Sequence, residues 1–312
     1  MRIASLLPSA TEIVCAIGLE SELVAISDDC DYPPSIAGTP VVTRRVDPSV
    51  DQDPTSREIH ARVAAAARDD RPLAVLDADG LADARPDLII TQATCPACAI
   101  TTREVDAVVR EAGLAATVVS LSPTSIEGIL NSITTVGAMA EVEDAAIDLV
   151  ESLRERLGKV EERVAVRREG GRRAPRTVAL EWLDPPFAVG HWVPEQVRRA
   201  GGWDLLGADG EPARPTSWDA VAEVDPEMLF LMPCGFHLAD TVREWTRTPV
   251  PPWLADLPAM RAGAVFALDG SSYFSRPGPR VIAGIELLAE IMDPDGFVDL
   301  APADSWTPVS PG

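Results

Sequence analysis

The chain contains almost no lysine, only two tyrosines and no long apolar segment. Lys159 is the only lysine among 27 basic residues, and 49 acidic residues bring the formal net charge to −22. Such a surface repels nucleic acid and anionic membranes, since both require positive charge to displace their counterions. No apolar run reaches the roughly 18 residues that a membrane-spanning helix needs. The sequence therefore predicts neither nucleic-acid binding nor membrane insertion.

Signals of export and of serine hydrolysis are also missing. The apolar stretch at residues 3–7 lacks the basic stretch, longer apolar core and cleavage site of a secretory signal. No Gly-x-Ser-x-Gly motif occurs, and only three histidines are present. We expect a cytoplasmic protein that is not a serine hydrolase. Abundant acid and arginine favour a halophilic cytoplasm of high salt over a surface tuned only for solubility.

Short apolar runs alternate with helical patterns in two parts of the chain. Strands are expected at 3–7, 23–26, 41–42, 88–90 and 116–119, with helices near 9–17, 56–69 and 101–112. Ser9 and Glu12 have the spacing of a capping box at the first helix. The alternation restarts at residue 177. This order predicts an α/β fold with parallel sheets and helices on both faces of each sheet.

A helical segment separates these two parts. From Glu143 the sequence has no proline before residue 168, and apolar residues recur at helical spacing among many charges. This pattern predicts a long, partly exposed helix that acts as a rigid spacer; a coiled coil would need a longer heptad repeat. We therefore expect an N-terminal α/β lobe at 1–122, linking helices at 123–170, and a C-terminal α/β lobe at 171–312.

An internal match supports two equivalent lobes. Residues 81–90 can be laid over residues 221–230, and each segment reads as the end of a helix, a proline, and an acidic residue that opens an apolar strand. Proline between helix and strand is common, so one such match can arise by chance. Together with the long spacer, the match favours a duplicated α/β lobe.

Candidate ligand residues follow the predicted strands. In open parallel sheets, ligands bind beyond the carboxyl ends of the strands. The loops there hold both tyrosines, two tryptophans and four of the five cysteines. The alternative is that these tryptophans pack beneath loops and the cysteines fill gaps. The candidates are Cys30, Asp31, Tyr32, Cys95, Cys98, Glu181, Trp182, His191, Trp192, Cys234, Phe236, Tyr273, Phe274 and Arg276.

The cysteines permit two further interpretations. Cys95 and Cys98 form a Cys-x-x-Cys pair, which occurs in redox enzymes, although such a motif should open a helix after the first strand of its fold. As a metal clip, the pair needs further ligands, which Cys30 and Cys234 can supply, with His191, His237 and Glu181 in reserve. A metal ion or iron–sulfur cluster on four thiolates is therefore an open alternative. Cys15 lies on the apolar face of the first helix and is expected in the core.

Five segments resemble a known family. The chain is similar to the helical-backbone (class III, TroA-like) solute-binding proteins, and within them to the cobalamin-binding, BtuF-like branch of ABC transporter substrate-binding proteins. The resemblance covers essentially the whole chain and is carried by residues 5–13, 30–34, 88–92, 190–195 and 273–279.

The resemblance implies a binding protein without a catalytic step. Its fold would be two Rossmann-like lobes with parallel sheets, joined by a long backbone helix. Its ligand would be a corrinoid, cobalamin-like, or a related metal chelate, clasped between the lobes. An ABC permease would be the partner, although the missing export signal departs from the family. The family's aromatic contacts would correspond to Trp182, Trp192, Phe236, Tyr273 and Phe274.

Overall fold

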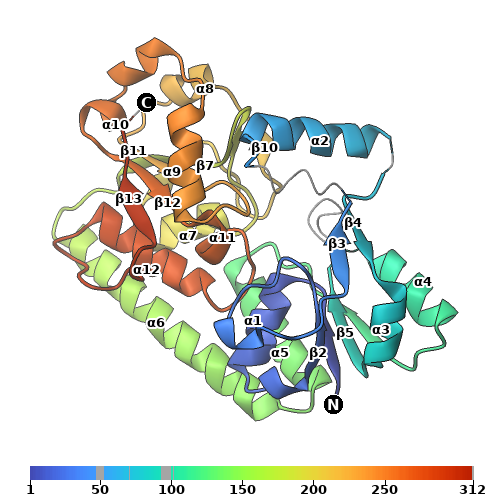
Figure 1. Cartoon of the computed structure of the whole chain (residues 1–312). Coiled ribbons are helices and arrows are strands. Elements are labelled where there is room, and N and C mark those ends of the chain that lie inside the picture. The colour runs from blue at the N-terminus through green and yellow to red at the C-terminus, as the bar shows by residue number, and fades with distance from the viewer. Residues whose placement is uncertain (47–52, 70, 93–99, 101, 311–312) are drawn as a thin grey trace. The chain divides into compact units, whose positions relative to one another are not determined.

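The computed structural model describes residues 1–46, 53–69, 71–92, 100 and 102–310 (Figure 1). The chain divides into two compact units. Unit 1 contains residues 1–53, 61–123 and 127–152, and unit 2 contains residues 54–60, 124–126 and 153–312. The long helix predicted from Glu143 is α6 (Glu143–Glu169), and the division between the units falls inside it. The spacer is therefore shared between the units, whereas the sequence assigned 123–170 to a separate segment.

Unit 1 is built on a parallel sheet. Its strand order is β2-β1-β5-β6, with every neighbouring pair parallel. The strands are β1 (Ile3–Ser5), β2 (Leu23–Ile26), β5 (Leu88–Thr91) and β6 (Thr117–Ser120). A separate antiparallel pair, β3 (Thr43–Arg45) and β4 (Ala74–Leu76), was only partly expected from the sequence. The helices are α1 (Pro8–Ala16), α2 (Ser56–Arg68), α3 (Ala78–Ala84), α4 (Thr102–Glu111) and α5 (Ile126–Met139), with short 3-10 turns at Glu20–Glu22 and Pro34–Ile36. Residues 56–60 of α2 and residue 126 of α5 belong to unit 2.

Helix α1 begins differently from the prediction. Leu7 is the N-cap, Pro8 opens the helix, and no side chain caps it. Ser9 is buried inside the first turn, so the predicted capping box is wrong. Proline at the first helical position lacks an N–H that would otherwise need a partner, and this makes a side-chain cap less necessary.

Unit 2 is built on a mixed sheet of seven strands. Its order is β10-β8-β7-β11-β12-β13, and β9 also pairs with β7. Strands β9, β7, β11 and β12 are parallel neighbours, whereas β8, β10 and β13 are antiparallel additions. The strands are β7 (Arg176–Leu183), β8 (Pro186–Ala188), β9 (Trp203–Asp204), β10 (Arg214–Pro215), β11 (Met228–Leu231), β12 (Val265–Leu268) and β13 (Trp306–Pro308). The prediction of a wholly parallel sheet is thus correct for the centre of this sheet and wrong for its margins.

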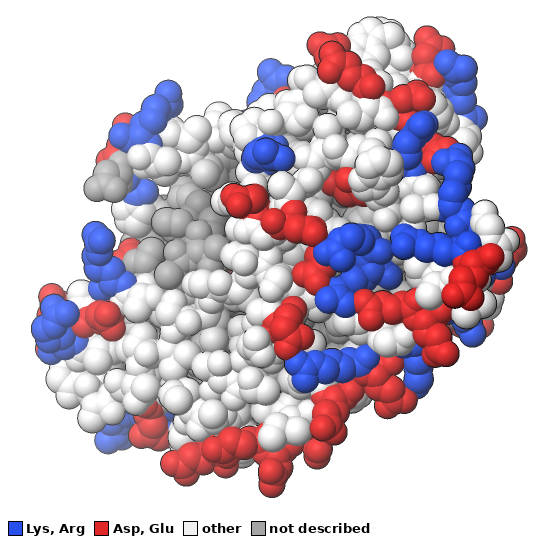
Figure 2. Space-filling model, turned by 180° about the vertical axis from the view of Figure 1, so that it is seen from behind, with Lys and Arg blue, Asp and Glu red and all other residues white. Residues whose placement is uncertain are grey.

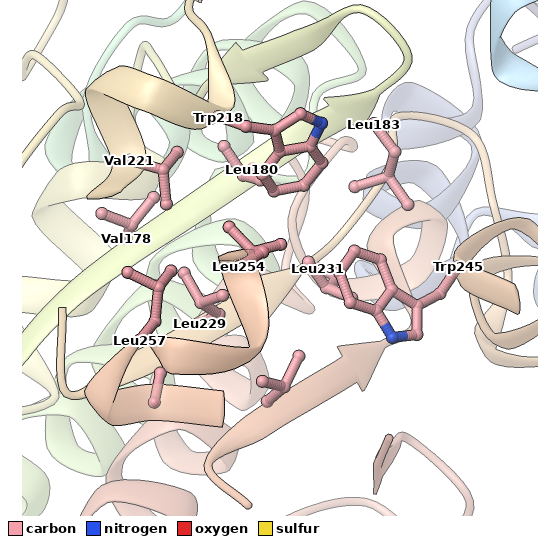
Figure 3. Close-up of a cluster of buried hydrophobic side chains, with 12 residues drawn as sticks. Val178, Leu180, Leu183, Trp218, Val221, Leu229, Leu231, Trp245, Leu254 and Leu257 are labelled. Carbon is pink, nitrogen blue, oxygen red and sulfur yellow. The ribbon is translucent and has the colours of Figure 1, made fainter. Parts of the chain in front are cut away.

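One face of this sheet carries a core built around two tryptophans (Figure 3). Leu180 and Leu231 extend from β7 and β11 towards Trp218 and Trp245, whose rings lie 6.0 Å apart. Trp245 is 1% exposed, and its Nε1 donates to the carbonyl of Ser310 at 3.0 Å. The helices of this unit are α7 (Val193–Arg199), α8 (Trp218–Glu223), α9 (Leu238–Arg247), α10 (Pro258–Arg261), α11 (Gly270–Tyr273) and α12 (Val281–Met292), with a 3-10 turn at Pro252–Asp256.

The predicted α/β architecture with a long helix is confirmed. In α6 the apolar residues Val150, Leu153, Leu157 and Val160 are all buried, as their helical spacing predicts. No helix in the described part of the chain combines the length and apolar character that a membrane span requires.

Candidate functional site

The loops that follow the central strands of unit 2 are tied to one another. The backbone N–H of Cys234, after β11, donates to the carbonyl of Glu181 in β7 at 3.0 Å. The N–H of Ser271, after β12, donates to the carbonyl of Phe236 at 2.9 Å. These bonds join the end of β7 and the loops after β11 and β12 into one edge, which we call the loop edge of unit 2; Glu181 and Trp182, which the sequence placed in a loop, lie within β7 itself. The structure therefore brings together the candidate residues that the sequence placed after these three strands.

Two aromatic rings meet at the loop edge. The rings of Trp182 and Phe236 lie 5.6 Å apart at 72°, an edge-to-face arrangement. Both side chains are half-buried. The indole Nε1 of Trp182 donates to the carbonyl of Ser56 at 3.2 Å. An edge-to-face pair is favourable because the positive edge of one ring meets the negative face of the other.

The other three aromatic residues predicted from the sequence, Trp192, Tyr273 and Phe274, are buried or half-buried. Trp192 and Phe274 are only 7% and 2% exposed, and the indole of Trp192 donates to the carbonyl of Phe274 at 2.9 Å. Tyr273 is half-buried, with the guanidinium of Arg280 at 5.8 Å from its ring centre. Trp192 and Phe274 are therefore packed beneath the loops, as the alternative to ligand binding holds for such aromatic residues. Direct ligand contact by these two side chains stays a prediction.

Gln196 was not predicted from the sequence, yet it holds the Tyr273 loop. It is fully buried in α7, and its Nε2 donates to the carbonyls of Tyr273 at 3.1 Å and Val281 at 2.9 Å. The sequence of α7 carries no signal for this role, because Gln196 stands among Glu195, Arg198 and Arg199 and its burial is evident only from the structure. Arg276 follows on the same loop and is half-buried.

Glu181 is a carboxyl group with an altered acidity. Burial raises the pKa of Glu181 to about 7, although an N–H donated by Gly190 at 3.3 Å opposes the shift. The tight backbone at Gly190 requires glycine, because a Cβ there would lie 2.3 Å from the amide nitrogen of Ala213. A carboxyl group with a pKa near 7 changes its charge within the physiological range.

His191 is held in an unusual backbone conformation beside this glycine. Its φ is +52°, and its N–H donates to the carbonyl of Glu211 at 2.6 Å. The imidazole stacks on Trp192 at 5.8 Å and 26°, and burial lowers the pKa of His191. Within the described chain its buried Nδ1 has no hydrogen-bond partner. A neutral imidazole of this kind is the form that binds metal ions.

His237 and Asp269 form a second polar pair at the loop edge. The Nδ1 of His237 lies 3.2 Å from Oδ2 of Asp269, and the hydroxyl of Ser272 donates to the same oxygen at 2.8 Å. Burial alone would raise the pKa of Asp269, but hydrogen bonds from His237 and Ser272 outweigh it and leave the pKa below its usual value. The Asp-x-x-Ser spacing at the start of α11 is a sequence signal for the contact between Asp269 and Ser272, since Asp269 caps that helix, but it does not point to His237.

In unit 1 the described candidates are Cys30, Asp31 and Tyr32, and the thiol of Cys30 contacts two hydroxyl groups. The Sγ of Cys30 lies 3.0 Å from the hydroxyl of Thr11 and 3.4 Å from that of Ser27. Asp31 is exposed, and Tyr32 is 43% exposed. Cys15 is half-buried, and burial raises the pKa of its thiol to about 11. The raised pKa leaves little thiolate at neutral pH, and Cys15 is half-buried, whereas the sequence placed it in the core.

Only two of the four cysteines of the predicted thiolate site, Cys30 and Cys234, belong to the described residues. Cys95 and Cys98 lie outside the described residues, so the four-thiolate metal site and the redox pair both stay predictions. Cys234, the thiol assigned to the second lobe, is exposed. Among the described residues, no group of three or more histidine, cysteine, aspartate or glutamate side chains is arranged to hold a metal ion.

Comparisons with known proteins agree with this architecture. The sequence matches the periplasmic binding protein family over residues 3–271. The structure resembles a periplasmic haem-binding protein from Pseudomonas aeruginosa, with 21% identity, a TM-score of 0.68, and coverage of 94% of this chain and 92% of that chain. It also resembles the periplasmic vitamin B12-binding protein BtuF of Vibrio cholerae, with 23% identity, a TM-score of 0.64, and coverage of 94% and 96%.

A third similar structure belongs to an ABC-type Fe3+-hydroxamate transport system from Saccharomonospora viridis, with 18% identity, a TM-score of 0.64, and coverage of 93% of this chain and 92% of that chain. No curated protein matches the sequence. At these identities the structural likeness shows the fold, whereas the family match spans most of the chain. The chain therefore belongs to the periplasmic binding protein family, and its fold is that of the helical-backbone (class III, TroA-like) binding proteins.

Proposed function

We propose that this protein binds a flat metal chelate of the corrinoid or tetrapyrrole class, with cobalamin as the first candidate. The observation that carries the proposal is the Trp182–Phe236 pair, which lies over the carboxyl ends of β7 and β11. The similar structures of the vitamin B12-binding and haem-binding proteins support the same ligand class. The family membership makes an ABC permease the partner to be tested.

The chemistry of the loop edge suits such a ligand. A macrocycle presents large apolar faces, and aromatic side chains bind such faces with about 0.5–1.5 kcal/mol per ring pair beyond the area that is buried. Corrinoids and porphyrins also carry polar substituents at their rim. Glu181, with its pKa raised to about 7, offers either a donor or an acceptor to those substituents within the physiological pH range.

Two side chains of unit 2 that can bind metals are His191, between β8 and α7, and Cys234, at the loop edge. Burial keeps His191 neutral near pH 7, because it lowers the pKa of the imidazole. Cys234 presents an exposed thiol on the loop after β11. A chelated metal ion with an open axial position would accept either of them. The absorption spectrum of the bound chelate reports such axial ligation directly.

The test is titration of ligand-free protein with cyanocobalamin, cobinamide and hemin, each followed by absorbance and by thermal unfolding. A ligand that binds the native state alone raises the unfolding midpoint, and above its Kd the rise grows with the logarithm of its concentration. Trp182→Ala should weaken the response. Trp203→Ala is the matched control, since Trp203 in β9 is 61% exposed and lies where β9 pairs with the first residues of β7. Absence of any shift with all three chelates would refute the proposal.

A further inference from the structure

A short segment from the first half of the chain is docked within unit 2. We call Pro54–His60 the strap; residues on both sides of it belong to unit 1. Its third residue, Ser56, is completely buried. It also opens helix α2, so the strap combines a loop with the first turn of that helix.

A buried carboxylate holds the strap. Glu244 in α9 is 1% exposed, and its Oε1 accepts the backbone N–H of Ser56 at 2.8 Å as well as the Ser56 hydroxyl. Its Oε2 accepts Nε of Arg247 at 2.6 Å, and Nη2 of Arg247 donates to the carbonyl of Pro54 at 2.8 Å. A buried carboxylate requires such partners, because removing one of them leaves an uncompensated charge or donor.

The strap in turn holds the hairpin that carries Trp182. The carbonyl of Ser56 accepts Nε1 of Trp182 at 3.2 Å. Arg57 pairs with Asp184 at 2.8 Å, and the imidazole of His60 lies 5.6 Å from the ring of Phe187. All three contacts fall on β7, β8 and the turn between them. Since Phe236 meets the Trp182 ring edge-to-face, the orientation of the indole is fixed at one point by the strap and at another by the loop after β11.

We propose that the strap sets the affinity of the loop edge for its ligand, with Ser56 and Glu244 as positioning residues that act through Trp182. The carboxylate of Glu244 fixes Ser56, and the Ser56 carbonyl fixes the plane of the indole. This inference rests on the proposed function only in naming the ligand class. The positioning of Trp182 itself is testable without any ligand.

The ligand-free test follows the indole N–H resonances of the seven tryptophans. Trp182→Phe removes one resonance and thereby assigns Trp182. Glu244→Gln places an amide N–H against the Nε–H of Arg247 and should move the Trp182 resonance; Ser56→Ala removes one hydroxyl and should move it less. Glu286→Gln is the control, because Glu286 in α12 binds Arg156 in a similar carboxylate–guanidinium pair. An unmoved Trp182 resonance in both strap variants would overturn the inference.

The ligand test uses cyanocobalamin and hemin and a double-mutant cycle. Glu244→Gln should raise the Kd about fivefold, the equivalent of one misplaced aromatic contact. In a Trp182→Ala background the same substitution should have no further effect, because the two residues act through one contact. An equal loss in both backgrounds would overturn the inference. If neither chelate binds the wild-type protein, the proposed function fails while the resonance test still decides the role of the strap. Ser56→Ala serves both tests if Glu244→Gln does not fold.

Discussion

The carboxylate of Asp87 accepts the backbone N–H of Arg2 at 2.7 Å, so that the acidic residue just before β5 fixes the start of the neighbouring strand β1. Glu227 repeats this contact in unit 2, where it accepts the N–H of Arg176 at 3.0 Å before β11 and β7. In return, the backbone N–H of Asp87 donates to the carbonyl of Arg2, and that of Glu227 to the carbonyl of Arg176, each at 2.8 Å. The two units thus use the same reciprocal clip at equivalent strands.

The turn before each clip is also repeated. Arg85 and Asp225 occupy equivalent positions of the internal match, and both have positive φ angles, of 42° and 50°. The backbone N–H of Arg85 donates to the carbonyl of Ala82 at 3.2 Å, and the backbone N–H of Asp225 donates to the carbonyl of Ala222 at 3.0 Å. Positive φ is uncommon outside glycine, so its recurrence at matched positions is a stronger sign of duplication than the shared proline. The internal match between 81–90 and 221–230 is confirmed.

Glu227→Gln should destabilise the protein at neutral pH and have little effect near pH 2. Hydrogen bonds from Arg173 and from the backbone of Arg176 lower the pKa of Glu227 from 4.5 to about 2. Because the folded pKa is lowered, the stabilisation is present above pH 4.5 and is lost as the pH falls towards 2. The carboxylate is partly exposed, so we expect a loss of about 1 kcal/mol.

Chemical denaturation at pH 7 and at pH 2 measures this effect. Asp209→Asn is the control, because Asp209 pairs with Arg198 where both side chains are more than half exposed. Equal losses for the two variants at pH 7 would show that the clip at Glu227 contributes no more than a surface ion pair.

Asp204→Asn should reduce the stability of the protein less at pH 7 than at pH 4. Burial raises the pKa of Asp204 from 3.8 to about 6, against N–H groups donated by Ala179 at 2.9 Å and Gly207 at 2.6 Å. With a raised folded pKa, an acid stabilises the native state while protonated, and this stability declines as the pH rises from about 4 to 6. Asparagine keeps one acceptor and carries no charge. Unfolding midpoints of both proteins across this range test the prediction, and parallel curves would contradict it.

Much of the fold could be predicted from apolar periodicity, because that pattern reflects burial directly. Helix α6 is the clearest case, since its apolar residues recur at helical spacing over a long proline-free stretch. The antiparallel strands β8, β10 and β13 could not be predicted in the same way. Each contains only two or three residues, too few to show any period.

The candidate site was predictable at the level of loops and less so at the level of side chains. Topology alone brings the residues after β7, β11 and β12 to one edge. Which aromatic ring is exposed depends on packing beneath the loop, and so Trp192 is buried while Trp182 is half-buried. The role of Ser56 had no sequence signal at all, because it depends on Glu244, which is 188 positions away.

Raising the KCl concentration from about 0.1 M to 1 M should raise the unfolding midpoint, since the Debye length falls from about 10 Å to 3 Å over this range. The net charge is −22, and Figure 2 shows acidic side chains along the lower edge and the right-hand part of one face, beside clusters of basic side chains. Screening reduces their mutual repulsion in the compact state. Sucrose is the comparison, because it stabilises by exclusion without screening charge. A midpoint that is constant or falls with KCl would count against the halophilic cytoplasm that the composition predicts.

Ligand affinity should fall as the pH rises through 7, and Glu181→Gln should remove this dependence. Burial already raises the pKa of Glu181 to about 7, and an apolar macrocycle laid over the loop edge would remove more water from the carboxyl group. The protonated form is therefore the one that binds, and each further unit of pKa shift on binding corresponds to a tenfold difference in affinity between low and high pH. Glutamine resembles the protonated acid and should bind at pH 8 as the wild-type protein does at pH 6. Glu223→Gln, at an exposed position in α8, should retain the wild-type pH profile. The measurement is the Kd for cyanocobalamin at pH 6, 7 and 8. An affinity that rises with pH would mean that the ionised carboxylate contacts a cationic or donor group of the ligand, and would reverse the role assigned to Glu181.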